Sequence, residues 1–154
     1  MNAPRSTLTL HAAGAVPADR AGLNVLTLAN DADVAALAAS GALAGVERIE
    51  LQFPVFTDGR AYTQAVLLRR RHRYTGELRA TGDVLIDQLV HMHRSGFTSA
   101  VLAAGVDPAA AARQFARYAA FYQGDVLEPL PLFARRAPAS APHPMNHEPA
   151  LEAA

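Results

Sequence analysis

Apolar and polar positions between residues 23 and 122 switch repeatedly between a strand pattern and a helical pattern. Strand patterns at residues 23–29, 46–53, 77–81 and 99–103 predict four β-strands. Helical spacing predicts four helices, over about 32–40, from Asp58 to about Arg71, over about 84–95, and from Asp107 onward. The last helix is expected to carry Ala111, Phe115, Tyr118 and Tyr122 on one stripe. This alternation predicts an α/β fold of about four βα units with a mainly parallel sheet, either an open doubly wound sheet or a half-barrel.

Turn and cap residues support these boundaries. Helix starts are expected at residues that accept hydrogen bonds from free N–H groups, namely Asn30 or Asp31, Asp58, Asp83 and Asp107. Pro108 strengthens the last of these starts, and Gly96 is expected to end the third helix. Within the second strand, Ile49, Leu51 and Phe53 share one face, so Glu50 on the other face should be wet or paired.

The chain divides into one domain with two flanking segments. Residues 1–22 lack a clear period and are expected to form a flexible N-terminal arm with a short strand at Leu8–Leu10. Residues 23–136 form the single α/β domain. Residues 137–154 are rich in Ala, Pro and His, and we expect a disordered C-terminal tail.

Composition narrows the function classes. Hydrophobic residues make up 51% of the chain and the formal net charge is zero, so a core is feasible and no overall field favours nucleic acid or an acidic membrane. There is no Cys, and all 14 basic residues are Arg, which excludes disulfides, thiolate nucleophiles and lysine chemistry. Apolar runs are too short for a membrane span, and no signal peptide is visible, so a cytoplasmic location is expected.

Cofactor and metal signatures are also missing from the sequence. Neither a GxGxxG nor a GxxxxGK[ST] pattern occurs, so no cofactor is predicted. His91 and His93 diverge on a helix, and Pro144 between His143 and His147 opposes a helical pair, so no metal site is predicted.

An ordered series of short motifs follows the second strand. It comprises Phe53-Pro54 with Phe56, Asp58-Gly59-Arg60 with Tyr62, Gly76-Glu77-Leu78-Arg79-Ala80, Gly82-Asp83-Val84-Leu85 with Asp87-Gln88-Leu89, Gly96-Phe97, and Pro129-Leu130-Pro131-Leu132-Phe133 with Arg135-Arg136. Over residues 23–136 this series resembles the bacterial "domain of unknown function 934" family. The chain departs from the usual pattern at Ala61, Thr63, Ile86 and Ser95, where Gly, Ser, Arg and Cys are frequent. The last two departures weaken any role for a cation or a thiol at those positions.

The resemblance implies a pathway, because genes of that family neighbour the gene for the sulfite reductase haemoprotein. We therefore expect an accessory protein of assimilatory sulfite reduction that acts with the haemoprotein or with its electron donor. Whether the protein is an enzyme stays open, and the alternative is a small oxidoreductase or anion-binding enzyme of sulfur assimilation.

Candidate site residues lie at the expected carboxyl ends of parallel strands, where α/β proteins bind ligands. Asp58, Arg60, Arg79 and Asp83 could together hold a small oxyanion such as sulfite through guanidinium groups and helix N-termini. The alternative is that the aspartates are helix caps that pair with the arginines. Glu77 and Arg79 share a strand face and are expected to form a structural ion pair.

Two further groups of polar residues have simple structural interpretations. Asp87, His91 and Ser95 lie on one helix face, and a salt link between the first two is expected rather than catalysis. The densest positive charge is the group Arg69, Arg70, Arg71 and Arg73 at a helix C-terminus. It is either a solvated helix end or a docking patch for an acidic partner such as a ferredoxin-like electron carrier.

Overall fold

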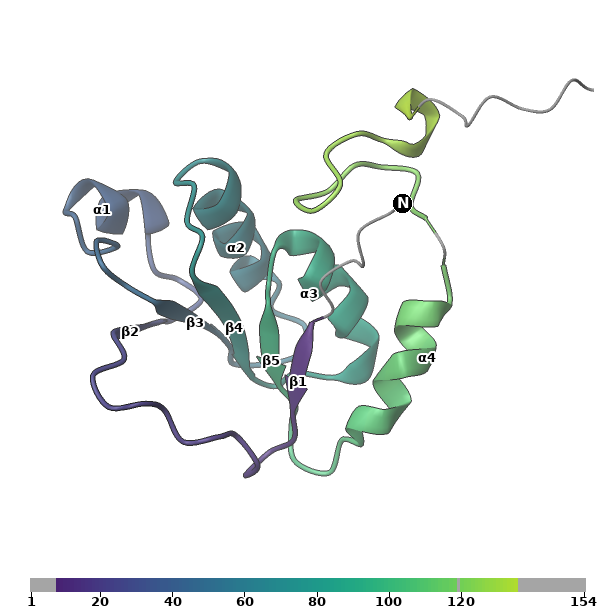
Figure 1. Cartoon of the computed structure of the whole chain (residues 1–154), viewed down its shortest axis with the longest axis horizontal. Helices are drawn as coiled ribbons and strands as arrows, with labels where there is room; N and C mark the ends of the chain where they lie inside the picture. Colours follow the sequence, from purple (N-terminus) through teal and green to yellow (C-terminus); the bar gives the residue numbers. More distant parts are fainter. Residues whose placement is uncertain (1–7, 119, 136–154) are drawn as a thin grey trace, which may run out of the picture.

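The structure is a computed structural model that describes residues 8–118 and 120–135. At its centre lies a five-stranded parallel sheet (Figure 1). Its strands are β1 (Thr9–His11), β2 (Val25–Leu28), β3 (Arg48–Phe53), β4 (Glu77–Gly82) and β5 (Ser99–Val101). The order across the sheet is β1-β5-β4-β3-β2, and every neighbouring pair is parallel. The parallel α/β fold is therefore confirmed, with one strand more than the four βα units supply.

Helices follow β2 to β5 along the chain. They are α1 (Val34–Ala39), α2 (Arg60–Arg70), the 3-10 turn η1 (Ile86–Gln88) leading into α3 (Leu89–Ser95), and the turn η2 (Pro108–Ala110) leading into α4 (Ala111–Ala116); a last turn is η3 (Leu132–Ala134). Crossovers between parallel strands are right-handed as a rule, so strands β2 to β5 in consecutive order place their helices on one face. Figure 1 shows α1, α2 and α3 side by side on that face, with α4 beside α3. This is the half-barrel arrangement.

The core lies between the sheet and this helical layer. Ile49, Leu51 and Phe53 of β3 are fully buried, as the alternation in their strand predicts. Ala61 and Ala65 of α2 are also fully buried, and their small side chains let the helix lie close to the sheet.

The opposite face of the sheet is charged. Arg79 is only 8% exposed and lies 2.9 Å from Glu77 and 3.9 Å from Glu50, and its Nε donates to Ser99 Oγ at 3.3 Å. The predicted Glu77–Arg79 pair is confirmed, and Glu50 is paired as expected. Burial makes such a network costly to break, because removal of one partner leaves a charge uncompensated.

Residues 12–24 connect the two edges of the sheet and will be called the strap. The strap is needed because β1 and β2 lie at opposite edges. Its Asp19 accepts two hydrogen bonds from the buried Arg48, at 2.7 and 2.5 Å, and its Arg20 pairs with Glu47. The strap is thereby fixed to the charged face, on the side away from the helices.

Residues 8–22 of the expected N-terminal arm contain a strand, and residues 1–7 of that arm lie outside the described residues. The short strand is present as β1, one residue later than predicted, and it pairs in parallel with β5 through Thr9↔Ser99. Leu8 is buried in the core, which explains why this part of the arm is ordered. The predicted tail, residues 137–154, lies outside the described residues.

Three predicted helix starts and one helix end are wrong. The cap of α2 is Gly59, with no capping side chain, and not Asp58. The cap of α1 is Asp33, which accepts from the N–H groups of Ala35 and Ala36, and not Asn30 or Asp31. Asp83 does not cap a helix, because its carboxylate binds a neighbouring loop. The last helix ends at Ala116, so the predicted stripe does not extend to Tyr118 and Tyr122, which are exposed. Asp107 and Gly96 act as predicted, as the cap of η2 and the left-handed end of α3.

Gly82 should tolerate substitution poorly, because it combines a positive φ with a close approach of backbone. Its φ is +95°, and an added Cβ would lie 2.3 Å from the carbonyl oxygen of Phe53. Gly105 is the matched control, because its φ is +81° but an added Cβ would meet nothing within 4 Å. We expect Gly105→Ala to reduce the free energy of unfolding by about 1 kcal/mol, and Gly82→Ala by about 3 kcal/mol or more, in urea titrations. Equal losses would contradict the close approach of β3 and β4.

Arg79 should be important for stability. Arg79→Ala removes the cation that pairs with Glu77, while Glu50 keeps its pairing with Arg48, so we expect the free energy of unfolding to fall by about 3 kcal/mol. The control is Arg113→Ala on the exposed side of α4, with an expected loss below about 0.5 kcal/mol. A loss at Arg79 no larger than at Arg113 would show that the ion-pair network does not stabilise the sheet.

Candidate functional site

The carboxyl end of the sheet is organised around the loop of residues 54–59, between β3 and α2. Asp83 Oδ2 accepts a hydrogen bond from the Phe56 N–H at 2.8 Å, and Gln88 Nε2 donates to the Phe56 carbonyl at 3.2 Å. Gln88 Oε1 in turn accepts from the Leu85 N–H at 3.0 Å. Asp83 and Gln88, from the motif series, therefore hold this loop, and they leave the side chains of Val55 and Phe56 exposed.

Asp58 and Arg60 form an ion pair at the end of the same loop. Arg60 Nη2 lies 2.7 Å from Asp58 Oδ2, and Asn30 Nδ2 donates to that oxygen at 2.5 Å. Hydrogen bonds from the Arg60 side chain and backbone are the main cause that lowers the pKa of Asp58 to about 2. The Arg60 charge is thus compensated by Asp58.

The structure brings three of the four oxyanion candidates to one loop and leaves the fourth elsewhere. Asp58 lies in the loop of residues 54–59, Arg60 follows this loop and pairs with Asp58, and Asp83 accepts a hydrogen bond from the loop. Arg79 lies within β4 on the charged face and binds Glu77, so it does not join them. Arg60 pairs with Asp58, as the structural interpretation expects, whereas Arg79 pairs with Glu77 and Glu50 and not with an aspartate.

Charge is separated between the two ends of the sheet. Six of the eight aspartates follow the carboxyl ends of strands: Asp31, Asp33, Asp58, Asp83, Asp87 and Asp107. Four arginines lie at the amino end, between the last turn of α2 and the start of β4: Arg69, Arg70, Arg71 and Arg73. A chain with zero net charge therefore has an acidic end and a basic end.

Arg69 has a structural role at the basic end. Its guanidinium group donates to the carbonyl oxygens of Gly96, Tyr74 and Gly76 at 2.9, 2.7 and 2.8 Å. Burial lowers the pKa of Arg69. These bonds join α2 to the end of α3 and the start of β4, so Arg69 is not available to a docking partner. The remaining three, Arg70, Arg71 and Arg73, are exposed and will be called the basic cluster.

Residues 120–135, the C-terminal segment, fold back beside the basic cluster. Arg94 of α3 anchors this segment, because it pairs with Asp125 at 2.9 Å, donates to the Gln123 carbonyl at 3.1 Å and lies over the Phe121 ring at 4.1 Å. The Val126 N–H also donates to the Arg94 carbonyl at 3.1 Å. This role could not be predicted from local sequence, since Arg94 and Asp125 are 31 residues apart and belong to no motif.

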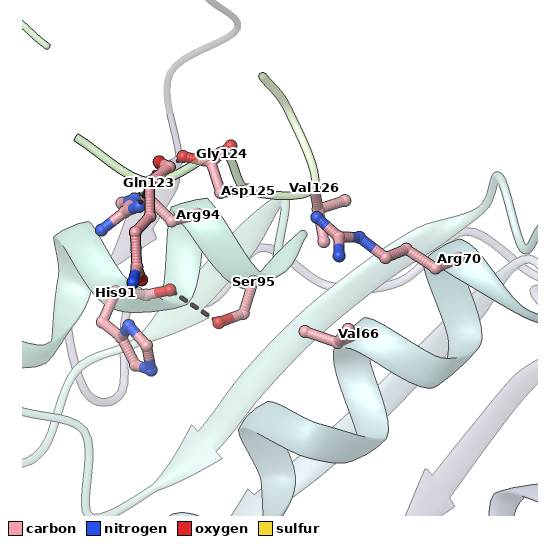
Figure 2. Close-up of a pocket in the computed structure, with 9 residues that line it drawn as sticks. All are labelled: Val66, Arg70, His91, Arg94, Ser95, Gln123, Gly124, Asp125 and Val126. Atoms are coloured by element: carbon pink, nitrogen blue, oxygen red, sulfur yellow. Dashed lines mark hydrogen bonds and ion pairs between the residues drawn. The ribbon is translucent and has the colours of Figure 1, made fainter. Parts of the chain in front are cut away.

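A pocket of about 230 Å³ lies between α2, α3 and the C-terminal segment (Figure 2). Figure 2 shows the Arg70 side chain extending from α2 toward Val126, with Ser95 on α3 facing the same space. Arg70 thus links the basic cluster to the C-terminal segment, and the two form one continuous surface.

The row Asp87, His91 and Ser95 is not a catalytic arrangement. Ser95 Oγ donates to the backbone carbonyl of His91 at 2.9 Å, and the His91 ring lies 4.3 Å from the Tyr62 ring. Burial, and then the charge of Arg94, lower the pKa of His91. The base and the nucleophile are therefore not hydrogen-bonded through their side chains, as such a mechanism requires.

The described residues provide neither a cluster of metal ligands nor a helix that could span a membrane. No three side chains of His, Cys, Asp or Glu within residues 8–118 and 120–135 are grouped to hold a metal ion. Every helix in the same ranges is too short or too polar to cross a membrane.

Arg60 should control the ionisation of Asp58. We expect Arg60→Gln to raise the pKa of Asp58 from about 2 toward its ordinary range, because the strongest hydrogen bonds to the carboxylate are lost. Carboxyl-carbon NMR titrations of both proteins measure this change. The Arg71→Gln variant is the control and should leave the value unchanged, since Arg71 lies at the opposite end of the sheet. An unaltered titration in the Arg60 variant would contradict the ion pair.

Comparison with known proteins identifies a family. Residues 25–133 match the model of the family described as "Bacterial protein of unknown function (DUF934)". No curated protein and no solved structure matches the chain. The matched range begins at β2 and ends within η3, so it contains both the loop of residues 54–59 and most of the C-terminal segment. The chain belongs to the DUF934 family.

Proposed function

We propose that this protein is an accessory protein of sulfite reduction that binds the sulfite reductase haemoprotein or its electron donor through the basic end of its sheet. The observation that carries the proposal is the exposure of aromatic side chains on the C-terminal segment and of arginines in the adjacent basic cluster. Tyr122 and Phe133 are each 70% exposed, and the C-terminal segment that carries them lies beside the basic cluster.

The aromatic part of this surface is ordered rather than loose. The rings of Tyr122 and Phe133 lie 5.4 Å apart, and the Leu132 N–H donates to the Tyr122 carbonyl at 3.1 Å. Leu130 and Leu132 are exposed beside them. Preformed aromatic side chains lose little conformational entropy on association, and they are enriched among residues that dominate binding energy.

The charged part of the surface is available for pairing. Within the described part of the chain, Arg70, Arg71 and Arg73 take part in no ion pair or side-chain hydrogen bond. Arginine is enriched at protein interfaces, and a cluster of like charge accelerates the encounter with an acidic partner. This favours an acidic electron carrier, or an acidic face of the haemoprotein, as the protein that docks here.

Neutralising the basic cluster should weaken this association. We expect the triple variant Arg70→Gln, Arg71→Gln, Arg73→Gln to bind the partner about tenfold more weakly at low salt, with a smaller difference at high salt. Interferometry measures the dissociation constants of the variant and of the wild-type protein for the purified haemoprotein and for the purified electron donor, at low and at high salt. The single variant Arg113→Gln, which removes one exposed charge from α4, is the control. Unchanged affinity for both partners would exclude docking through the basic cluster.

The pathway is tested by growth. Deletion of the gene should impair growth on sulfate or sulfite, and cysteine should restore it, because only the reduction step would be affected. The deleted strain should regain growth with the wild-type gene and regain less with the triple arginine variant. Normal growth of the deletion strain on sulfate, with no second copy present, would contradict the proposed role.

A further inference from the structure

A hollow of about 360 Å³ opens between α1 and α2 at the acidic end of the sheet, opposite the basic cluster. Its polar lining comes from the turn after β2 and from the first two turns of α2, and consists of Asn30, Asp31, Asp33, Arg60, Thr63 and Gln64. The hydrogen-bonding capacity left over in this lining determines which ligand it can hold.

Gln64 supplies a buried acceptor without a partner. The residue is 5% exposed, and its Nε2 donates to the carbonyls of Ala29 and Ala32 at 2.9 and 3.0 Å. These two bonds fix the orientation of the amide, because the oxygen could not take the same place. Gln64 Oε1 is then left buried with no hydrogen-bond partner. A buried acceptor of this kind is stabilised by an incoming N–H donor.

The other lining groups are also acceptors. Asp31 is exposed and makes no hydrogen bond or ion pair within residues 8–118 and 120–135. Asn30 uses its N–H on Asp58, which leaves its side-chain oxygen toward further donors. Arg60 is the cation of the lining, and Asp58 holds it at 2.7 Å. The hollow therefore has free carboxylate and amide oxygens, and its positive charge is already compensated.

Two exposed apolar side chains lie on the loop that precedes Arg60, a lining residue of the hollow. Val55 is 53% exposed and Phe56 is 42% exposed, on the loop that Asp83 and Gln88 hold in place. Asp58 connects this loop to the hollow through its bond from Asn30. A partner protein can contact the apolar side chains and place a cation in the hollow at the same time, whereas a free small molecule would use only the hollow.

We propose that this hollow binds an arginine or lysine side chain of a basic partner protein, whose surface packs against Val55 and Phe56. The guanidinium or ammonium group would donate to Asp31 and to the amide oxygens. Charge complementarity favours this occupant, because Asp87 and Asp107 are exposed at the same end of the sheet. The site goes beyond the docking surface at the basic end, and its position allows a second partner to bind at the same time.

The test uses a defined peptide in place of the partner. The full-length protein, labelled with ¹⁵N, is titrated with acetyl-Leu-Arg-Leu-amide and followed by amide chemical shifts. We expect the signals of residues 30–33, Phe56 and Gln64 to move, and Asp31→Asn to weaken binding by at least about fivefold, because a charge-assisted hydrogen bond is lost. Phe56→Ser should weaken binding as well. Asp87→Asn, at the same end but outside the hollow, is the matched control and should leave binding unchanged.

Three results would overturn the proposal. A peptide with citrulline in place of arginine that binds equally well would exclude recognition of the charge. Shifts confined to residues outside the hollow and its loop would exclude the site. Binding of sulfite or sulfate to the hollow, with no response to the arginine peptide, would show an anion site instead. The triple variant of the basic cluster should bind the peptide normally, so failure here and failure of the proposed docking at the other end remain distinguishable.

Discussion

The consecutive order of the parallel strands β2 to β5 determines most of the architecture. Because the strands are parallel, each helix that connects two of them, α1, α2 and α3, starts at the carboxyl end of the sheet and finishes at the amino end, and the common crossover hand places these helices on one face. Aspartate is favoured at the start of a helix and arginine at its end, through capping and the helix dipole. In a layer of helices that all point the same way, the aspartates therefore gather at one end of the sheet and the arginines at the other. The chain has an acidic end and a basic end although its formal net charge is zero.

The same order leaves one face of the sheet without helices. Parallel sheets are usually covered on both faces, and their strands are then apolar throughout. Here Arg48, Glu50, Glu77 and Arg79 occupy the second face, and they satisfy one another across neighbouring strands. The strap contacts this face at Arg48, where Asp19 completes the pairing of the guanidinium group. Specific ion pairs here take the place that a second helical layer has in other sheets.

The fold could be predicted from local patterns, because strand alternation and helix spacing are local properties. The core face of Ile49, Leu51 and Phe53, the pair Glu77–Arg79 and the end of α3 at Gly96 all follow from short stretches of sequence. The pairing of β1 with β5 could not be predicted in this way, since nothing near Thr9 identifies its neighbour. The choice between an open sheet and a half-barrel likewise depends on strand order, which local patterns do not contain.

The candidate site residues could be predicted only in part, because local sequence patterns do not show which distant residues come into contact. Asp58 and Arg60 are two residues apart, and their pairing follows from a turn before a helix. Asp83 also looks like a cap, but its carboxylate reaches the N–H of Phe56, 27 positions earlier in the chain. Arg69 is one of four similar arginines in the sequence, and only the three carbonyls around it distinguish it as structural. Long-range contacts of this kind assign different roles to residues that look alike in a motif.

The position of β1 has a consequence for how the chain is made. Strand β1 is synthesised before β2 to β5, yet its partner Ser99 follows much later, so among these strands β1 is one of the last that can be paired. Until then the strap has no second anchor and the edge of β5 has no neighbour. Such distant pairing slows folding and lengthens the time in which an unpaired strand edge is accessible to other chains. Pairing of β1 with β5 is thus a late step in the assembly of the sheet, because it requires β5 to be in place.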